Sequence, residues 1–197
     1  TVSKEPLVFE QFQHIGFQKT YSASDYTTDS GASGTALATG TKTKNGQIGV
    51  GPDGKNLKSI LKIAEDNQLA TGLVSTSSIL HATPASFIAN NKDRHNYSAL
   101  ALDFLKTDID VFIGGGKDYF ENREDDKNLT DSLKNKGYKV HYDMDEIQKV
   151  KEGKLAGLTA PNHNPKYSEG RGEMLPQSTS TAIDILDNNS NGFFLFV

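Results

Sequence analysis

Short apolar runs alternate with amphipathic segments along most of the chain. Runs rich in β-branched or aromatic residues, bordered by Gly or polar residues, predict β-strands, and they lie at residues 72–75, 109–113, 138–142 and 192–197. Apolar residues that recur on one face of a helical period predict helices, at residues 56–67, 98–105, 129–134 and 179–186. This alternation predicts an α/β fold in which helices cover the faces of a mostly parallel sheet.

Three local features refine this pattern. Residues 157–177 are rich in Gly, Pro and Asn without any period, which predicts a long surface loop. Asn56 is predicted to cap the first of these four helices, and the final run, GFFLFV, predicts a buried strand. Because 197 residues contain no repeat or linker, we interpret residues 1–197 as a single domain.

Composition excludes several classes of site and partner. The chain has no Cys, so disulfides and thiolate metal sites are excluded. A net charge of −4 provides no broad basic surface, which argues against nucleic acid as a partner. No run of about 18 apolar residues is present, so we predict no membrane segment and expect a soluble chain. The first residues lack the features of a signal peptide, which leaves the localisation open.

The stretch YTTDSGASGTALATG, at residues 26–40, consists almost wholly of small side chains. Such residues bury little apolar surface but allow a close approach to the backbone. A helix is predicted over residues 31–38, and its free N–H groups and positive dipole end favour an anion such as phosphate. Ser30 is therefore placed where a hydroxyl nucleophile could meet a phosphoryl group. The alternative is that Ser30 or Asp29 only caps the helix, while the small residues let two helices pack closely.

A serine hydroxyl needs a base or a metal to become a nucleophile at neutral pH. The nucleophile elbow of α/β-hydrolases, G-x-S-x-G, is not matched, because Thr35 stands where its last Gly belongs. Metal activation is the remaining route for Ser30.

Two glycine-rich segments are weaker candidates. GVGPDGKN, at residues 49–56, follows a P-loop as far as Lys55 but has Asn56 in place of Ser or Thr and is typical of a turn. A P-loop nucleotide enzyme is therefore a remote alternative. GGG, at residues 114–116, does not complete a dinucleotide fingerprint and indicates a tight strand exit.

A second candidate segment, LHATPASFIANNKDRHNYS, follows the strand at residues 72–75. His81 could serve a metal or its surroundings, Thr83 could provide oxygen to Mg²⁺, and Arg94 could clamp a phosphate. Each has a plainer alternative, as a structural histidine or a solvated side chain. The other histidines are widely scattered, and no complete zinc site can be written from this chain.

Together these motifs resemble the alkaline phosphatase family. TTDSGASGTALATGTKTKNGQIGV is similar to the family signature, and HATPASF followed by Arg94 is similar to the magnesium segment and phosphate-binding arginine. IDVFIGGG and STAIDILDNNSNGFFLFV look like further family landmarks. The resemblance covers almost the whole chain, and it implies a three-layer sandwich with a mostly parallel central sheet.

The resemblance also implies roles for individual residues. Ser30 would attack phosphate beside a metal and form a phosphoserine, with Asp29 holding the arginine and Arg94 gripping the phosphate oxygens. Thr83 would be a Mg²⁺ ligand, and His81 would occupy a position next to the metal. Zn²⁺ and Mg²⁺ would be the cofactors and a phosphate monoester the substrate of the parent enzyme. That parent would be a homodimer, periplasmic or secreted.

One departure from the family pattern concerns the metal ligands. Family members have an Asp at a strand end before the matched region, and after FFLFV a Glu for Mg²⁺ and Asp and His residues for Zn²⁺. Because these are missing here, we interpret the sequence as an internal fragment of a catalytic domain, with a sheet incomplete at both chain ends. We expect little or no phosphatase activity from it alone, and self-association through unpaired sheet edges. The alternative from another class is a non-catalytic binding or scaffold module.

Overall fold

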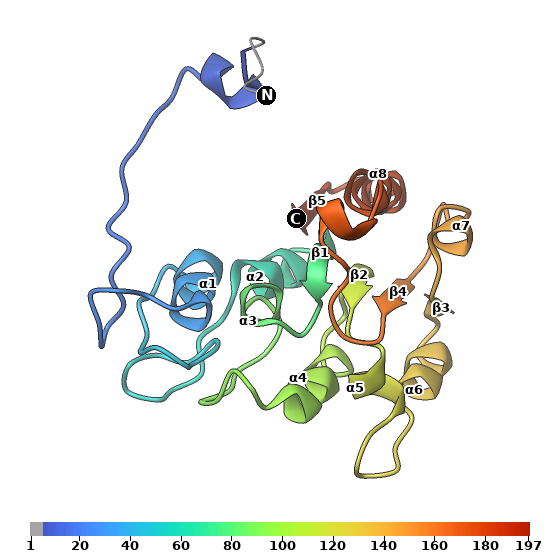
Figure 1. Ribbon diagram of the computed structural model, residues 1–197, viewed down its shortest axis with the longest axis horizontal. Coiled ribbons are helices and arrows are strands. Elements are labelled where there is room, and N and C mark those ends of the chain that lie inside the picture. The colour runs from blue at the N-terminus through green and yellow to red at the C-terminus, as the bar shows by residue number, and fades with distance from the viewer. Residues whose placement is uncertain (1–5) are drawn as a thin grey trace.

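Five parallel strands form the centre of the molecule, described here by a computed structural model for residues 6–197 (Figure 1). Their order across the sheet is β3-β4-β2-β1-β5, and every neighbouring pair is parallel. The strands are β1 (Ala70–Ser78), β2 (Val111–Gly115), β3 (Lys139–His141), β4 (Leu155–Ala160) and β5 (Phe193–Phe196). Since all of them run the same way, their carboxyl ends meet at one edge, where α/β sheets bind ligands.

Helices cover both faces of this sheet. Figure 1 shows α7 and α8 on one side and α4, α5 and α6 on the other, with the strands between them. The helices are α1 (Ser30–Thr39), α2 (Ile60–Asp66), α3 (Ala82–Ala85), α4 (Tyr97–Phe104), α5 (Asp118–Glu121), α6 (Leu129–Asn135), α7 (Met144–Ile147) and α8 (Met174–Leu186), with short 3₁₀ turns η1 (Val8–Gln11) and η2 (Tyr167–Glu169). The expected three-layer α/β architecture is confirmed.

Alternation along the strands divides the apolar side chains between two cores. Leu73 and Phe112 point toward the face covered by α4, α5 and α6. Their sequence neighbours Val74 and Ile113 point toward α7 and α8. On the first face the ring of Phe112 lies 4.9 Å from that of Phe104 and 6.1 Å from that of Phe120, centroid to centroid. This aromatic cluster fixes α4 and α5 against the sheet.

The prediction of a long loop at residues 157–177 is wrong at both ends. Its first residues belong to β4, and its last residues belong to α8, which begins at Met174. Gly and Ala interrupt the apolar pattern of β4, although its first four residues are buried. Gly157 is small for a packing reason, because a Cβ there would come within 3.1 Å of the Ile113 side chain. A strand made of small residues gives little periodic signal.

Two further boundaries differ from expectation. The helix predicted from Asn56 begins at Ile60 instead, because the Ser59 side chain accepts a hydrogen bond from the Lys62 N–H and caps it. The final strand was expected to be buried, yet all four residues of β5 are only partly buried. β5 pairs with β1 alone and so lies at the edge of the sheet.

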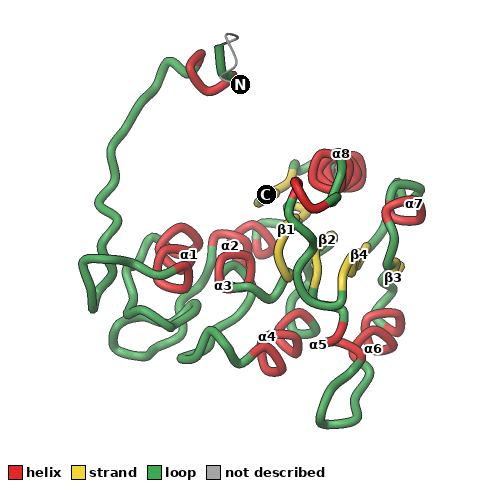
Figure 2. The backbone as a smooth tube through the Cα atoms, viewed as in Figure 1, coloured by secondary structure: helices red, strands yellow, loops and turns green. Residues whose placement is uncertain are grey.

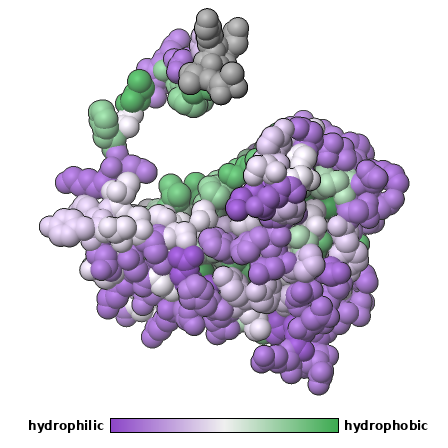
Figure 3. Space-filling model, in the orientation of Figure 1, coloured by the Kyte–Doolittle hydropathy of each residue, from purple (hydrophilic) through white to green (hydrophobic). Residues whose placement is uncertain are grey.

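The segment before α1 runs away from the sheet as an extended arm (Figure 2). Apolar side chains lie along it (Figure 3), among them Phe12, which is 66% exposed, and Ile15, which is 86% exposed. Exposed apolar side chains in such numbers favour contact with other protein surface. Between residues 6 and 197, no helix combines the length and apolarity that crossing a bilayer requires.

Removing the ring at the centre of the aromatic cluster should destabilise the fold. We expect Phe112→Ala to lower the free energy of unfolding by about 3–5 kcal/mol, because it leaves a cavity under α4 and α5. Phe17→Ala is the matched control, since the Phe17 side chain is fully exposed on the arm. Urea denaturation followed by circular dichroism measures both, and equal small effects would contradict the assigned core.

Candidate active site

The first turn of α1 is organised by Asp29. Its backbone is extended, with φ −92° and ψ 174°, and its Oδ1 accepts a hydrogen bond from the Ala32 N–H at 2.8 Å. Asp is among the residues best suited to this capping role. Ser30 follows as the first residue of the helix. Its hydroxyl group therefore belongs to the helix end where free N–H groups and the positive dipole end attract anions.

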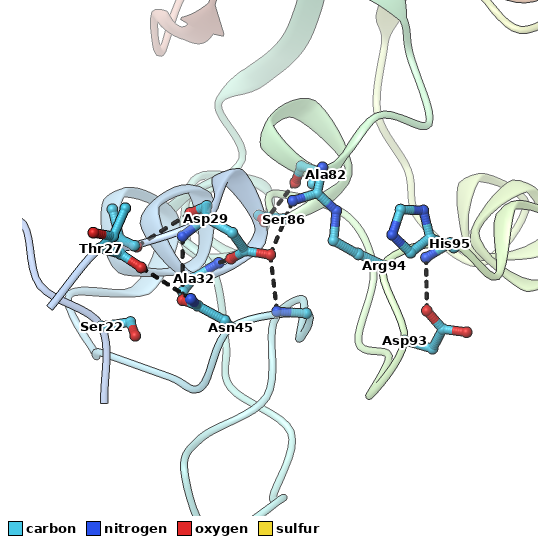
Figure 4. Close-up of polar contacts among 12 residues, drawn as sticks. Ser22, Thr27, Asp29, Ala32, Asn45, Ala82, Ser86, Asp93, Arg94 and His95 are labelled. Carbon is cyan, nitrogen blue, oxygen red and sulfur yellow. Dashed lines mark hydrogen bonds and ion pairs between the residues drawn. The ribbon is translucent and has the colours of Figure 1, made fainter. Parts of the chain in front are cut away.

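A salt bridge connects this helix end to the second candidate segment. Asp29 Oδ2 accepts hydrogen bonds from Arg94 Nη1 at 2.9 Å and from the Gly46 N–H at 2.9 Å. In Figure 4 the guanidinium group of Arg94 points toward the Asp29 carboxylate. Two residues that lie 65 positions apart in sequence are thus joined beside Ser30.

The surroundings of Arg94 leave part of its guanidinium group unused. The side chain is only 15% exposed, and its backbone N–H donates to the Gly46 carbonyl at 2.8 Å. Its Nε is buried and has no hydrogen-bond partner among the described residues. A buried donor without a partner is uncommon in proteins. Arg94 therefore retains hydrogen-bonding capacity for an anionic ligand such as phosphate.

The Asp29 carboxylate is held in its charged form. Partial burial by itself raises its pKa, but hydrogen bonds from the Ala32 N–H, from Arg94 and from the Gly46 N–H outweigh this effect. The positive charge of Arg94 adds to them, and the net result is a lowered pKa. Asp29 is therefore ionised at neutral pH, and it orients the arginine through a charge-assisted hydrogen bond.

The small residues of α1 serve helix packing as well. A Cβ on Gly34 would lie 2.9 Å from Ser86 Oγ and 3.0 Å from the Thr83 Cα. This confirms close packing of α1 against a second helix, α3, through its small residues. The same contact places Thr83 directly beside α1, so the two candidate segments adjoin.

His81 and Thr83 lie at the carboxyl end of β1. Both line a hollow of about 330 Å³ together with Ser75, Ser77 and Phe196. Burial lowers the pKa of His81, and the nearby charge of Arg94 lowers it further. His81 is therefore neutral at neutral pH, the form in which an imidazole binds a metal.

The donor set around this hollow is too small for a complete metal site. Across residues 6–197, no three His, Cys, Asp or Glu side chains are grouped so that they could hold a metal ion. Thr83 contributes one oxygen and His81 one nitrogen, whereas Mg²⁺ requires six ligands, mostly oxygen. Residues 6–197 therefore offer donors for only part of a Mg²⁺ site and no cluster for a zinc ion.

Sequence reasoning missed three residues at this site. Asn45 Oδ1 accepts from the Asp29 N–H at 3.1 Å, and its Nδ2 donates to the Thr27 carbonyl at 3.0 Å. Gly46, with φ +84°, completes an Asn-Gly turn that signals a bend without showing what it contacts. His163 Nδ1 accepts from the Ser78 N–H at 3.0 Å. Its ring centroid lies 5.6 Å from that of His81, so scattering in sequence was no guide to position.

The glycine-rich alternatives take the shapes expected of turns. The Gly54 N–H donates to the Gly51 carbonyl at 2.8 Å, and an antiparallel bridge between Val50 and Asn56 closes the segment. No helix begins directly after Lys55, as a P-loop requires. At the end of β2, Gly116 has φ +107°, which confirms a tight strand exit.

A sequence model of the alkaline phosphatase family matches residues 1–197 of this chain. The chain belongs to the alkaline phosphatase family. Alkaline phosphatase 4 of Bacillus subtilis is 42% identical over 178 residues, covering 86% of this chain and 38% of that protein. Alkaline phosphatase 3 of the same organism is 38% identical over 203 residues, which cover 98% of this chain and 43% of that protein. The chain thus spans about two fifths of the length of these curated relatives.

Solved alkaline phosphatases have the same fold. The cold-active enzyme from Shewanella sp. superimposes with a TM-score of 0.90 at 37% identity, covering 99% of this chain and 48% of that one. A histidine-to-aspartate mutant of the TAB5 enzyme, with Mg bound in its M3 site, gives a TM-score of 0.88 at 38% identity. The match covers 95% of this chain and 55% of that one. At such identities the likeness extends beyond the fold to the family.

Substitutions at Asp29 should separate its cap from its salt bridge. We expect Asp29→Ala to lower the free energy of unfolding by about 2 kcal/mol, because both the cap and the acceptor for Arg94 are lost. Asp29→Asn should cost less, because asparagine is also a good cap. Urea denaturation at pH 7 measures both variants, and equal losses would contradict separate roles.

The same comparison has a pH dependence. The lowered pKa of Asp29 contributes stability above its ordinary value of 3.8, and this contribution is lost as pH falls from there through the lower folded pKa. The difference in the free energy of unfolding between the unsubstituted chain and Asp29→Asn should therefore shrink over that acidic range. A difference that stays constant on acidification would contradict the charged salt bridge.

Proposed function

We propose that this chain carries the phosphate-gripping part of a phosphomonoesterase that works through a phosphoserine on Ser30. The contact between Arg94 Nη1 and Asp29 Oδ2 at 2.9 Å carries this proposal, because it brings a guanidinium group to the residue next to Ser30. The buried, unpartnered Arg94 Nε supports it further. Family membership supplies the reaction class.

The proposed reaction proceeds in two displacements. The Ser30 oxygen bonds to phosphorus while the ester P–O bond breaks, and the alcohol leaves with a proton. Water then attacks the phosphoserine and releases inorganic phosphate, which restores the hydroxyl group of Ser30. Arg94 and the N–H groups at the start of α1 hold the phosphate oxygens, whose negative charge they stabilise in both steps.

Mg²⁺ is the cofactor for which the chain offers the best ligands. We infer that Thr83 and His81 belong to one side of a Mg²⁺ site, consistent with the Mg bound in the related TAB5 mutant. When bound, such an ion supplies positive charge and a polarised water. Zn²⁺ stays a prediction from the family resemblance, because the described residues offer no cluster for it.

The chain by itself is proposed to bind phosphate and to hydrolyse esters poorly. Its described residues include the arginine, the helix end and two members of a metal site, but no complete set of metal ligands. The alternative of a non-catalytic binding module would then be a module that binds phosphate without hydrolysing its esters. Residues 1–197 are proposed to form one domain, part of the family's catalytic domain. Homodimerisation and export to the periplasm or medium stay predictions.

Activity measurements on the full polypeptide that contains this chain test the proposal. We expect Ser30→Ala to lower phosphate-ester turnover roughly 10³-fold or more, since the nucleophile is lost. Ser33→Ala is the matched control on the same helix and should retain activity. Acid quenching followed by mass spectrometry should find phosphate on Ser30 in the unmodified protein and in Ser33→Ala. Equal turnover in both variants, or phosphate on another residue, would overturn the assignment.

A further substitution tests the arginine. Arg94→Lys keeps the charge but loses the planar fork that can hold two phosphate oxygens. We expect turnover to fall about 100-fold, because the phosphate is misplaced relative to Ser30. Lys55→Arg, at an exposed turn, is the control. Full activity in Arg94→Lys would show that bidentate binding by Arg94 is not needed.

A further inference from the structure

The connection that follows β4 brings a second histidine to the carboxyl end of β1. In Figure 1 this connection runs from β4 across β2 toward α8. The Ser78 N–H donates to His163 Nδ1 at 3.0 Å, joining positions 85 residues apart. The imidazole of His163 then lies 5.6 Å from that of His81, at 72° between the ring planes. The edge of one ring therefore faces the other ring.

Glycine at the end of β2 makes this placement possible. A Cβ on Gly115 would lie 1.9 Å from the Asn162 carbonyl oxygen and 3.3 Å from the His163 Cα. The Gly116 N–H donates to the Ala160 carbonyl at 2.9 Å and fixes the start of the connection. The GGG motif thus does more than end a strand, because it lets residues 161–163 lie directly against β2.

The hydrogen bond to Ser78 determines the tautomer of His163. Nδ1 accepts from a backbone N–H, so it must carry a lone pair, and the ring proton of the neutral imidazole must lie on Nε2. Neither nitrogen is then free to ligate a metal. A site in which His81 and His163 chelate one ion is therefore excluded while this hydrogen bond is in place.

We propose that His163 is a positioning residue that holds the imidazole of His81 in its orientation at the hollow lined by Thr83. The His81 side chain makes no capping hydrogen bond to α3, and the ring of His163 packs edge-on against it. This inference rests on the proposed function only where it assigns His81 to the side of a Mg²⁺ site. The ring contact itself is independent of catalysis.

Three variants separate the hydrogen bond from the ring contact. His163→Asn keeps an acceptor near the Nδ1 position but removes the ring, whereas His163→Ala removes both. Gly115→Ala keeps the His163 side chain but displaces the connection that carries it. His14→Asn, on the exposed arm, is the matched control. A variant that failed to fold would leave the others to decide.

Nuclear magnetic resonance of ¹⁵N-histidine in the full polypeptide tests the ring contact directly. At pH 8 without metal we expect His163 as the Nε2–H tautomer, and the His81 ring signals to shift in His163→Asn and Gly115→Ala but not in His14→Asn. Exchange of the Ser78 amide proton should stay slow in His163→Asn and speed up in His163→Ala. An Nδ1–H tautomer of His163, or unchanged His81 signals in His163→Asn, would overturn the proposal.

Titration with MgCl₂ by calorimetry tests the consequence. We expect His163→Asn to raise the Kd for Mg²⁺ about 10-fold, as loss of a residue that orients a neighbour of the metal does, and His14→Asn to leave it unchanged. An unchanged Kd in His163→Asn would contradict a role toward the metal. Failure of the unsubstituted protein to bind Mg²⁺ would instead refute the magnesium assignment of the proposed function. The ring signals of His81 would still decide whether His163 is a positioning residue.

Discussion

The site depends on the salt bridge between Asp29 and Arg94. One carboxylate caps α1 through its Oδ1, and its Oδ2 receives both the guanidinium group and the Gly46 N–H. A single side chain thus sets the start of the helix, the position of the arginine and the path of the chain around residue 46. Because the pair is only partly exposed, solvent and salt weaken it less than a surface pair.

Close backbone contacts make this arrangement possible. Gly34 lets α3 approach α1 and so places Thr83 next to the helix that begins at Ser30. Gly115 lets the connection after β4 lie against β2 and delivers His163 to His81. In both places a Cβ would collide with a neighbouring segment, with Ser86 and the Thr83 backbone at Gly34 and with the Asn162 backbone at Gly115. These small residues therefore allow the polar side chains of the site to come together, and they contribute little to apolar burial.

Much of this could be predicted from the sequence, for physical reasons that differ between elements. The strands β1 and β2 were predicted because their apolar residues are contiguous and bounded by polar positions. β4 was missed because Gly157 and its neighbours are small, and the tight contacts with Ile147 and Ile113 that explain this choice are visible only in the structure. Ser30 was proposed as the nucleophile from a local signal, the start of a small-residue helix. The pairing of Asp29 with Arg94 came from family resemblance, because no local pattern encodes a contact across 65 positions.

The central claim is that Ser30 and Arg94 hold the same phosphate group. A crystal structure of the full polypeptide soaked with inorganic phosphate tests it most directly. We predict a phosphate ion at the start of α1, with its oxygens hydrogen-bonded to the guanidinium group of Arg94 and the Ser30 hydroxyl in contact with it. Phosphate bound elsewhere, with Arg94 turned away from Ser30, would contradict the account.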